Sequence, residues 1–258
     1  MKKYKLLAGI LLASLSLNSC YDLDRYPSDQ VSDGIFWKSE THAKQGMMGV
    51  YAAMQVDDAF GLKFTFDSMS DIGTGFGNEA YSDVITGIYN ERSSFVEKKW
   101  QSLFGVMRAN LVIRKIAEIE SMSESQKEQY VAEAKFMRAL FYFELYNFYG
   151  ALPLYDESVN LSTDYNNMKK PRSTEADVLK FILDDLDFAI THNLPVHWDV
   201  SEYGRATLGA AYALRGKVYL YMKEYTKAVA DFEEIILDKS GKGYNYSLYE
   251  DYSKLFTP

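Results

Sequence analysis

Apolar residues recur every three or four positions along much of the chain, which is the spacing of an amphipathic helix. The stretches with this period cover residues 40–55, 94–120, 124–149, 174–192, 206–222 and 224–238. No run of alternating β-branched residues competes with the helical period, as a half-buried strand would require. The pattern therefore predicts a mainly α protein in which helices are separated by long loops.

Several of these stretches begin with residue types that cap helices. The candidate capping boxes are Ser94 with Glu97, Ser125 with Glu128, and Thr174 with Asp177. In each, a hydroxyl and a carboxylate three residues later would satisfy amide groups that the first turn cannot bond internally. Gly150 and Pro153 are expected to end the third stretch.

The segment 130–149 is apolar around most of its helical circumference, which predicts a helix at the centre of the fold. Arg138 lies among these apolar residues, so we expect it to need a carboxylate partner and to have a structural role. Asp184, Asp185 and Asp187 form an acidic run for which we expect a solvated helix face. Adjacent residues of a helix point to different sides, so this run does not resemble a catalytic carboxylate pair.

The last two helical stretches carry the spacing of a tetratricopeptide repeat. The matching positions are Tyr212, Gly216, Tyr219, Ala228, Phe232 and Ile235. Small residues at 216 and 228 would let two helices approach closely, with aromatic rings filling the groove beside them. Residues 131–149 and 174–191 are candidates for a second pair, joined by the long loop 151–173.

The N-terminal segment is typical of a secretory signal. Basic residues at positions 2, 3 and 5 precede an apolar run over residues 6–17 and the only cysteine, Cys20. The ending Leu17-Asn18-Ser19-Cys20 resembles a bacterial lipobox, so we expect a signal peptide over residues 1–19 and a lipid on Cys20. The run is shorter than the roughly 20 residues that cross a bilayer, and no second long run follows. Residues 20–38 lack a helical period and are expected to form an extended lead after the anchor.

Composition and charge exclude several classes of function. Among 258 residues, 36 Asp and Glu outnumber 28 Lys and Arg, and a net charge of −8 argues against nucleic acid as a partner. One cysteine and three histidines are too few for a structural zinc site, and we expect neither a metal nor another cofactor. With 47% apolar residues, the chain can still build a packed core.

The sequence contains no arrangement typical of a catalytic site. The glycine-rich segment 73–77 lacks the Gly-Lys-Ser/Thr of a phosphate-binding loop. The histidines are His42, His192 and His197, and none has a neighbouring serine or cysteine suited to a triad. His192 and His197 with Asp199 do not have the spacing of helical metal ligands. The sequence therefore predicts that the protein is not an enzyme.

Aromatic and amide residues in the loops remain as binding candidates, because sugars stack on rings and bind polar side chains through their hydroxyls. Within the glycine-rich segment 71–90, the candidate glycan-binding residues are Phe76, Asn78, Glu79, Tyr81 and Tyr89. Trp198, in a polar loop, is a further candidate. The alternative for each is ordinary packing of a loop side chain onto the helices. Trp37 and Trp100 are predicted to be core residues.

Short motifs spread over nearly the whole chain after the N-terminal apolar run carry a family resemblance. They are Ser32-Asp33-x-x-Phe36-Trp37, Gly49-Val50-Tyr51, Trp100-x-x-Leu103-Phe104, Ala109-Asn110-x-Val112-Ile113, the run from Glu133 to Ala139 with Tyr142-Phe143, Tyr149-Gly150-Ala151-Leu152-Pro153-Leu154, Leu194-Pro195, Gly204-Arg205-Ala206-Thr207, and Leu248-Tyr249-x-x-Tyr252-x-x-Leu255-Phe256. Together they resemble the SusD/RagB family of outer-membrane nutrient-binding lipoproteins.

This resemblance implies a SusD-like, tetratricopeptide-like helical core over residues 39–258, a lipid anchor in the outer membrane with the protein at the cell surface, and capture of oligosaccharide. It also implies a partner, a SusC-like TonB-dependent barrel through which the oligosaccharide passes. Family chains commonly continue into a second half, so the sequence resembles the N-terminal half of the family. Part of the ligand site is therefore expected to be absent.

Two other functions stay open. A tetratricopeptide-like lipoprotein could bind protein alone, without glycan, in the concave groove that helical repeats offer. The third function is a glycan-cleaving enzyme, which the lack of an arranged carboxylate pair disfavours.

Overall fold

The computed structural model describes residues 36–56, 98–160 and 164–256, together with some residues between 67 and 91. The chain divides into two units, Met1–Phe36 and Trp37–Pro258, and the described helices lie in the second unit. These α-helices are α2 (Glu40–Ala52), α5 (Ser102–Ile116), α6 (Glu124–Tyr149), α7 (Glu175–Thr191), α8 (Leu208–Tyr221) and α9 (Tyr225–Ile236). No strand occurs among the described residues, and the prediction of a mainly α protein is confirmed.

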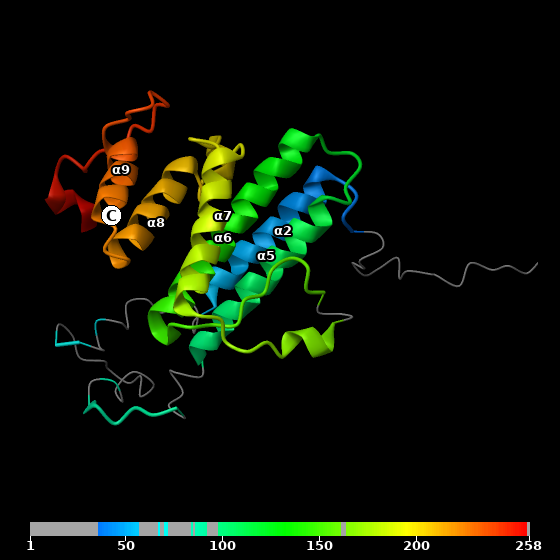
Figure 1. Cartoon of the computed structure of the whole chain (residues 1–258). Coiled ribbons are helices and arrows are strands. Elements are labelled where there is room, and N and C mark those ends of the chain that lie inside the picture. The colour runs from blue at the N-terminus through cyan, green and yellow to red at the C-terminus, as the bar shows by residue number, and fades with distance from the viewer. Residues whose placement is uncertain are drawn as a thin grey trace, which may run out of the picture. The chain divides into compact units, whose positions relative to one another are not determined.

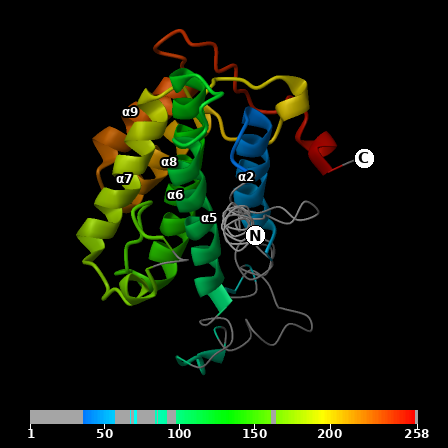
Figure 2. The ribbon, with the colours of Figure 1, turned by 90° about the vertical axis from the view of Figure 1, so that its right-hand side faces the viewer.

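Helices that follow one another in the sequence are also neighbours in space. α5 packs against α6, α6 against α7, α7 against α8 and α8 against α9, while α2 packs against α5 and α6. Figure 1 shows α8 and α9 following beyond α7, and in the view of Figure 2 these two helices lie behind α7. The predicted pairing of the segments 131–149 and 174–191 is thus confirmed as the packing of α6 against α7.

The helix α6 lies at the centre of the core, as its apolar circumference predicts. Phe141 and Tyr142 on this helix are fully buried. On α5, a Cβ at Gly105 would collide with the ring of Phe141, so a glycine there permits the close approach of the two helices. None of the helices in the described ranges is long and apolar enough to cross a membrane.

The tetratricopeptide spacing correctly identifies the α8–α9 pair. A Cβ at Gly216 would lie only 2.7 Å from the ring of Phe232, so the side chain of α9 occupies the space that glycine leaves on α8. Ala228, the other small residue of the motif, is 2% exposed. Small residues thus set the spacing of this pair.

Two of the predicted helix boundaries are confirmed by their cap chemistry. Thr174 and Asp177 form the predicted capping box at the start of α7, with the Asp177 amide 3.1 Å from the threonine hydroxyl. Gly150 follows the end of α6 with φ of 63°, a left-handed value that favours glycine. The predicted pair Ser94 and Glu97 lies outside the described residues.

The predicted capping box of Ser125 with Glu128 is wrong. The box at α6 is formed by Ser123 and Gln126, and the helix begins at Glu124. Ser123 has the extended backbone of an N-cap, whereas Ser125 already lies inside the first turn. Both serines have an acceptor side chain three residues later, so spacing alone does not distinguish them.

The two tryptophans predicted to be core residues differ in burial. Trp37 is 6% exposed, and a Cβ at Gly46 would lie 2.5 Å from its ring. Trp100 is half-buried and stacks on Tyr149 with ring centroids 4.3 Å apart. Both rings therefore pack against helices of the core.

Candidate functional site

Most of the residues predicted to bind glycan or lipid lie outside the described part of the chain. They are Cys20, Phe76, Asn78, Glu79 and Tyr81. Tyr89 is described, and 58% of its surface is exposed. A ring this exposed contributes little to the core, and its surface is accessible to a ligand.

Trp198 lies between α7 and α8 and is half-buried. Its indole N–H donates to the carbonyl oxygen of Ala206 at 2.7 Å, and the guanidinium of Arg205 lies 3.8 Å from a ring centroid of its indole. A cation this close covers part of the ring face. Trp198 therefore has a packing role, and only its remaining exposed surface could stack on a sugar.

Arg205 ties this segment to α2 and α6 through a buried cluster. Its Nε and Nη2 donate to the carboxylate of Glu133 at 2.9 and 2.5 Å, and the Glu133 side chain is fully buried. Tyr51 donates to the same carboxylate at 2.6 Å and accepts from the Ala206 amide at 2.7 Å. Burial and the charge of Glu133 raise the pKa of Tyr51, which keeps the hydroxyl protonated as a donor. This cluster holds the segment in place.

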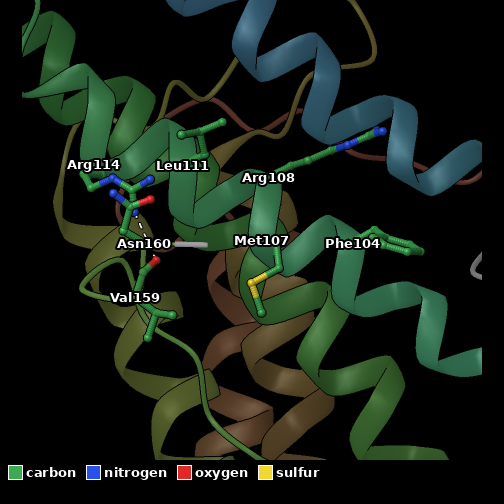
Figure 3. Close-up of a pocket in the computed structure, with 7 residues that line it drawn as sticks. All are labelled: Phe104, Met107, Arg108, Leu111, Arg114, Val159 and Asn160. Atoms are coloured by element: carbon green, nitrogen blue, oxygen red, sulfur yellow. Dashed lines mark hydrogen bonds between the residues drawn. The ribbon is translucent and has the colours of Figure 1, made fainter. Parts of the chain in front are cut away.

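A pocket with a volume of about 280 Å³ opens on the outer face of α5. It is lined by Phe104, Met107, Arg108, Leu111 and Arg114 from α5, and by Val159 and Asn160 from the loop after α6. We call this the α5 pocket. In Figure 3, Arg108 extends toward α2 and Arg114 turns toward Val159 and Asn160. The volume lies just below the ~300–1,000 Å³ range of small-molecule sites.

The two faces of α5 explain why the pocket forms there. Val106, Ala109 and Ile113 are buried and form the core face of the helix. Phe104 and Arg108 are separated by four residues and lie on the other face, one turn apart. Phe104 is 62% exposed, an unusual position for a large ring on a helix with such a complete core face.

Hydrogen bonds from α5 hold the loop that forms the opposite wall. Asn110 donates from Nδ2 to the carbonyl oxygen of Tyr155 at 2.9 Å. Arg114 donates from Nη1 to the carbonyl oxygens of Glu157 and Val159 at 3.4 and 3.1 Å, the second of which is the dashed line in Figure 3. The backbone from 155 to 159 is thus fixed before any ligand arrives.

Arg138 anchors the same loop from the interior. It is 1% exposed and donates to Asp185 at 2.7 and 2.8 Å, to Asn110 Oδ1 at 2.6 Å and to Glu157 at 2.6 Å. The predicted carboxylate partner of Arg138 is confirmed. Asp185 is 2% exposed, so its predicted place on a solvated face is wrong. The charge of Arg138 compensates the desolvation of this carboxylate, which explains how an acidic run contributes a core residue.

Arg138 and Glu157 keep their charges at neutral pH. Burial opposes the charge of Arg138, but hydrogen bonds and the charges of Asp185 and Glu157 outweigh burial and raise its pKa. Burial also opposes the charge of Glu157, yet Arg138 holds the pKa of that carboxyl below its ordinary value of 4.5. The ion pair that holds the loop is therefore formed at neutral pH.

A second pocket differs from the α5 pocket in the charge of its lining. The second pocket has a volume of about 300 Å³ and is lined by Ile116, Ala117, Glu124, Lys127, Glu128, Val131 and Phe188. Its lining combines two carboxylates with one ammonium, whereas the α5 pocket has two guanidinium groups and no carboxylate. A ligand of the α5 pocket would meet apolar surface and N–H donors.

The lining of the α5 pocket suits binding better than acid–base or nucleophilic chemistry. It has no Ser, Cys, His, Asp or Glu side chain, which are the usual nucleophiles and general bases. Among the described residues, no three His, Cys, Asp or Glu side chains are grouped to hold a metal ion. An aromatic ring beside guanidinium and amide donors can hold an oxygen-rich ligand by stacking and hydrogen bonding.

Sequence reasoning did not select the residues of this pocket as a site. Phe104 was part of a family motif, while Arg108, Arg114 and Asn160 carried no signal of their own. The available signal was the four-residue step from Phe104 to Arg108 on the face of α5 opposite its apolar stripe. The contribution of Asn160 depends on the folding of a loop about fifty residues away in sequence, which no local pattern predicts.

Comparison with known proteins identifies related sequences. A SusD-like family model, described as starch-binding and associating with the outer membrane, matches residues 23–220. A SusD-like protein P38 of Formosa agariphila is 30% identical over 237 residues, covering 88% of this chain and 45% of the relative. A SusD-like protein of Bacteroides ovatus is 30% identical over 228 residues, covering 84% of this chain and 39% of the relative. The chain therefore spans about half, or less, of the length of these curated relatives.

Solved structures show the same helical architecture. A SusD-like protein from Bacteroides fragilis has a TM-score of 0.71 and 29% identity, covering 87% of this chain and 42% of that chain. A structure described as a laminarin-binding SusD-like protein has a TM-score of 0.73 and 29% identity, covering 84% of this chain and 48% of that chain.

Proposed function

The chain belongs to the SusD-like family, and on that premise we propose that it binds oligosaccharide at the surface of the outer membrane and releases it uncut. The observation that carries this proposal is the match of residues 23–220 to a family described as starch-binding. A similar solved structure is described as laminarin-binding, which supports a glycan as the class of ligand. The lining of the α5 pocket, an exposed ring with guanidinium and amide donors, suits such a ligand.

We place the ligand contacts in two parts of the chain. The first is the α5 pocket, whose loop wall is held by the Arg138 cluster. The second consists of the candidates from the sequence, namely Phe76, Asn78, Glu79, Tyr81, Tyr89 and Trp198. Among these, Tyr89 is the one whose exposed ring can be tested against the described structure.

A glycan-binding assay with matched tyrosine variants tests this proposal. The full chain should be retarded in native gels that contain one of a panel of neutral and acidic glycans. Tyr89→Ala should reduce the retardation, while Tyr225→Ala should not, although the two rings are 58% and 59% exposed. Both variants should keep the parent melting temperature, since neither ring is buried. No retardation by any glycan would contradict the proposed function.

Release of uncut oligosaccharide is measured separately. Incubation of the chain with each bound glycan should produce no new reducing ends, because the α5 pocket holds no general acid or base. New reducing ends that increase with time would show that the protein is an enzyme and would contradict this part of the proposal.

We further propose that residues 1–19 are a signal peptide, that Cys20 carries the lipid anchor and that residues 20–38 connect it to the helical domain over 39–258. In this arrangement the protein delivers its oligosaccharide to a SusC-like TonB-dependent barrel. Expressed with its N-terminal segment in a lipoprotein-processing host, the chain should incorporate labelled fatty acid and sediment with membranes. Cys20→Ala should lose both properties, and unchanged labelling would contradict the anchor. Co-purification of the anchored chain with the barrel tests the partner.

A protein-binding lipoprotein is the alternative function, and one observation favours it. Three apolar side chains in α9 and directly after it are exposed to solvent. The exposed fraction is 52% for Val229, 68% for Ile236 and 61% for Leu237. Exposed apolar surface of this kind often contacts another protein. The alternative becomes the better interpretation if no glycan is retained while Val229→Asp abolishes co-purification with a defined protein partner.

A further inference from the structure

The charge of the α5 pocket is opposite to that of the protein as a whole. The chain carries a net charge of −8, yet the charged residues lining the pocket are Arg108 and Arg114. Neither arginine forms an ion pair with a carboxylate in the described part of the chain. The pocket therefore presents positive charge that no carboxylate neutralises among the residues the structure describes.

Three other arginines of the described residues are neutralised within the fold, whereas Arg172, outside the pocket, is exposed and donates to a backbone carbonyl. Arg138, Arg205 and Arg215 are each bonded to two carboxylates. Arg108 donates from Nη1 to the carbonyl oxygen of Gly49 at 2.8 Å, and within the described residues Arg114 donates to the backbone carbonyls of the loop wall. A guanidinium has five N–H donors, so each of these two keeps donors for a ligand.

The two charges lie at opposite ends of an apolar floor. Arg108 and Arg114 are six residues apart, which places their Cα atoms roughly 9 Å apart along the axis of α5. Met107 and Leu111 supply apolar surface on the same wall, and the exposed ring of Phe104 lies one turn before Arg108. This order of ring, cation, apolar floor and cation fits an elongated ligand with an apolar face and more than one anionic group.

We propose that the α5 pocket recognises an acidic oligosaccharide, one whose sugar rings carry carboxylate or sulfate groups. The ring of Phe104 stacks on a sugar face while Arg108 and Arg114 donate to the anionic groups, in the charge-assisted geometry that guanidinium favours. This inference rests on the proposed glycan-binding function and names the class of glycan. It also assigns specificity to Arg108, because this side chain is exposed and is not needed to hold the loop wall.

Calorimetric titration with charge-matched oligosaccharides tests the inference. The purified full chain is titrated with tetragalacturonate, with its fully methyl-esterified form, with a sulfated neocarratetraose and with neutral laminaritetraose. Tetragalacturonate or the sulfated sugar should bind at least about tenfold more tightly than the esterified and neutral sugars, and this preference should shrink as salt screens the charges. Which of the two anionic sugars binds decides between carboxylate and sulfate.

Three variants at two arginines separate a specific contact from a general effect of charge. Arg108→Gln should weaken binding of the preferred anionic sugar about tenfold, whereas Arg108→Lys should lose less. Arg172→Gln is the matched control, because Arg172 is also exposed and donates to a backbone carbonyl, that of Tyr149, outside the pocket. Melting curves establish that each variant is folded. Equal losses for Arg108→Gln and Arg172→Gln would overturn the inference.

The remaining outcomes distinguish this inference from the function on which it rests. Tight binding of laminaritetraose, with no preference for either anionic sugar, would overturn the acidic specificity and leave the proposed function standing. Failure of all four sugars and of a wider glycan panel would instead contradict the proposed function itself.

Discussion

The Arg138 cluster and the α5 pocket lie on two sides of the same loop, and they use arginine in opposite ways. Arg138 is 1% exposed and its donors bind three side chains, Asp185, Asn110 and Glu157. Arg108 is exposed and donates to one backbone carbonyl. A buried charge must be compensated within the fold, so Arg138 organises structure. A charge that remains exposed to solvent can be compensated by a ligand.

The two regions are connected through residues 155–159. Asn110 and Glu157 receive hydrogen bonds from Arg138, while Asn110 and Arg114 donate to backbone carbonyls of the same loop. The interior cluster thus positions a wall of the pocket without touching a ligand. Damage to the cluster should affect stability first and binding as a consequence, whereas damage to the pocket should affect binding alone.

The largest effect is expected for Arg138→Met. Among the described residues, the substitution leaves the buried carboxylate of Asp185 with Lys135, at 3.2 Å, as its cationic partner. Breaking a buried ion pair in this way costs about 3–5 kcal/mol. Urea denaturation should show this loss in the free energy of unfolding. The double variant Arg138→Met with Asp185→Leu should recover much of it, because no buried charge then remains at 185. A single variant as stable as the parent would contradict the structural role of the cluster.

A smaller loss is expected for Asn110→Ala. Asn110 is 2% exposed, and its removal leaves the Tyr155 carbonyl and one donor of Arg138 without this partner, which costs about 1–3 kcal/mol. Because the loop wall is released, affinity for oligosaccharide should fall as well. Asn147→Ala, at an exposed position of α6, is the control and should change neither quantity. Loss of stability with full affinity would show that the loop wall does not contribute to binding.

Removal of the exposed ring should affect binding alone. Phe104→Ala removes a side chain that is 62% exposed, so the free energy of unfolding should change by less than about 0.5 kcal/mol. Retardation by the bound glycan in a native gel should fall several-fold, because the stacking surface is lost. Tyr203→Ala removes a ring that is 72% exposed outside the pocket and should leave retardation unchanged. Equal retardation of both variants would show that Phe104 does not contribute to glycan binding.

The smallest effect concerns acid pH and Glu157. Arg138 holds the pKa of this carboxyl below its ordinary value of 4.5, so its contribution to stability is complete above that value and is lost as pH falls through the lower, folded-state pKa. The difference in stability between the parent and Glu157→Gln should therefore be largest at neutral pH and should shrink in acid. Denaturation midpoints of both proteins at several pH values measure it. A difference that grows toward acid would contradict the ion pair.

Much of the fold could be predicted from sequence because its signals are local. Helical period identified the helices, Thr174 and Asp177 identified the start of α7, and the small residue Gly216 identified the α8–α9 contact. The structural role of Arg138 could be predicted because a single charge in an apolar helix needs a carboxylate partner within the fold.

The incorrect and missing predictions have a common physical origin. Each of these features depends on contacts with residues that are far away in the sequence. Asp185 looks like its acidic neighbours in sequence, and only the approach of Arg138 from another helix makes its burial favourable. The α5 pocket likewise combines a face of one helix with a loop fixed by that cluster. The prediction of glycan contacts in the segment 71–90 rests on its composition, and apart from Tyr89 the candidates lie outside the described residues.

Methionine methyl resonances provide the most direct test that oligosaccharide binds in the α5 pocket. The chain has 10 methionines, of which Met107 lines the pocket and Met137 is 1% exposed in the core of α6. With methyl-labelled methionine and a saturating oligosaccharide, the Met107 resonance should shift while that of Met137 stays in place. An unchanged Met107 resonance at saturation, with glycan bound, would show that the ligand binds elsewhere and would contradict the account.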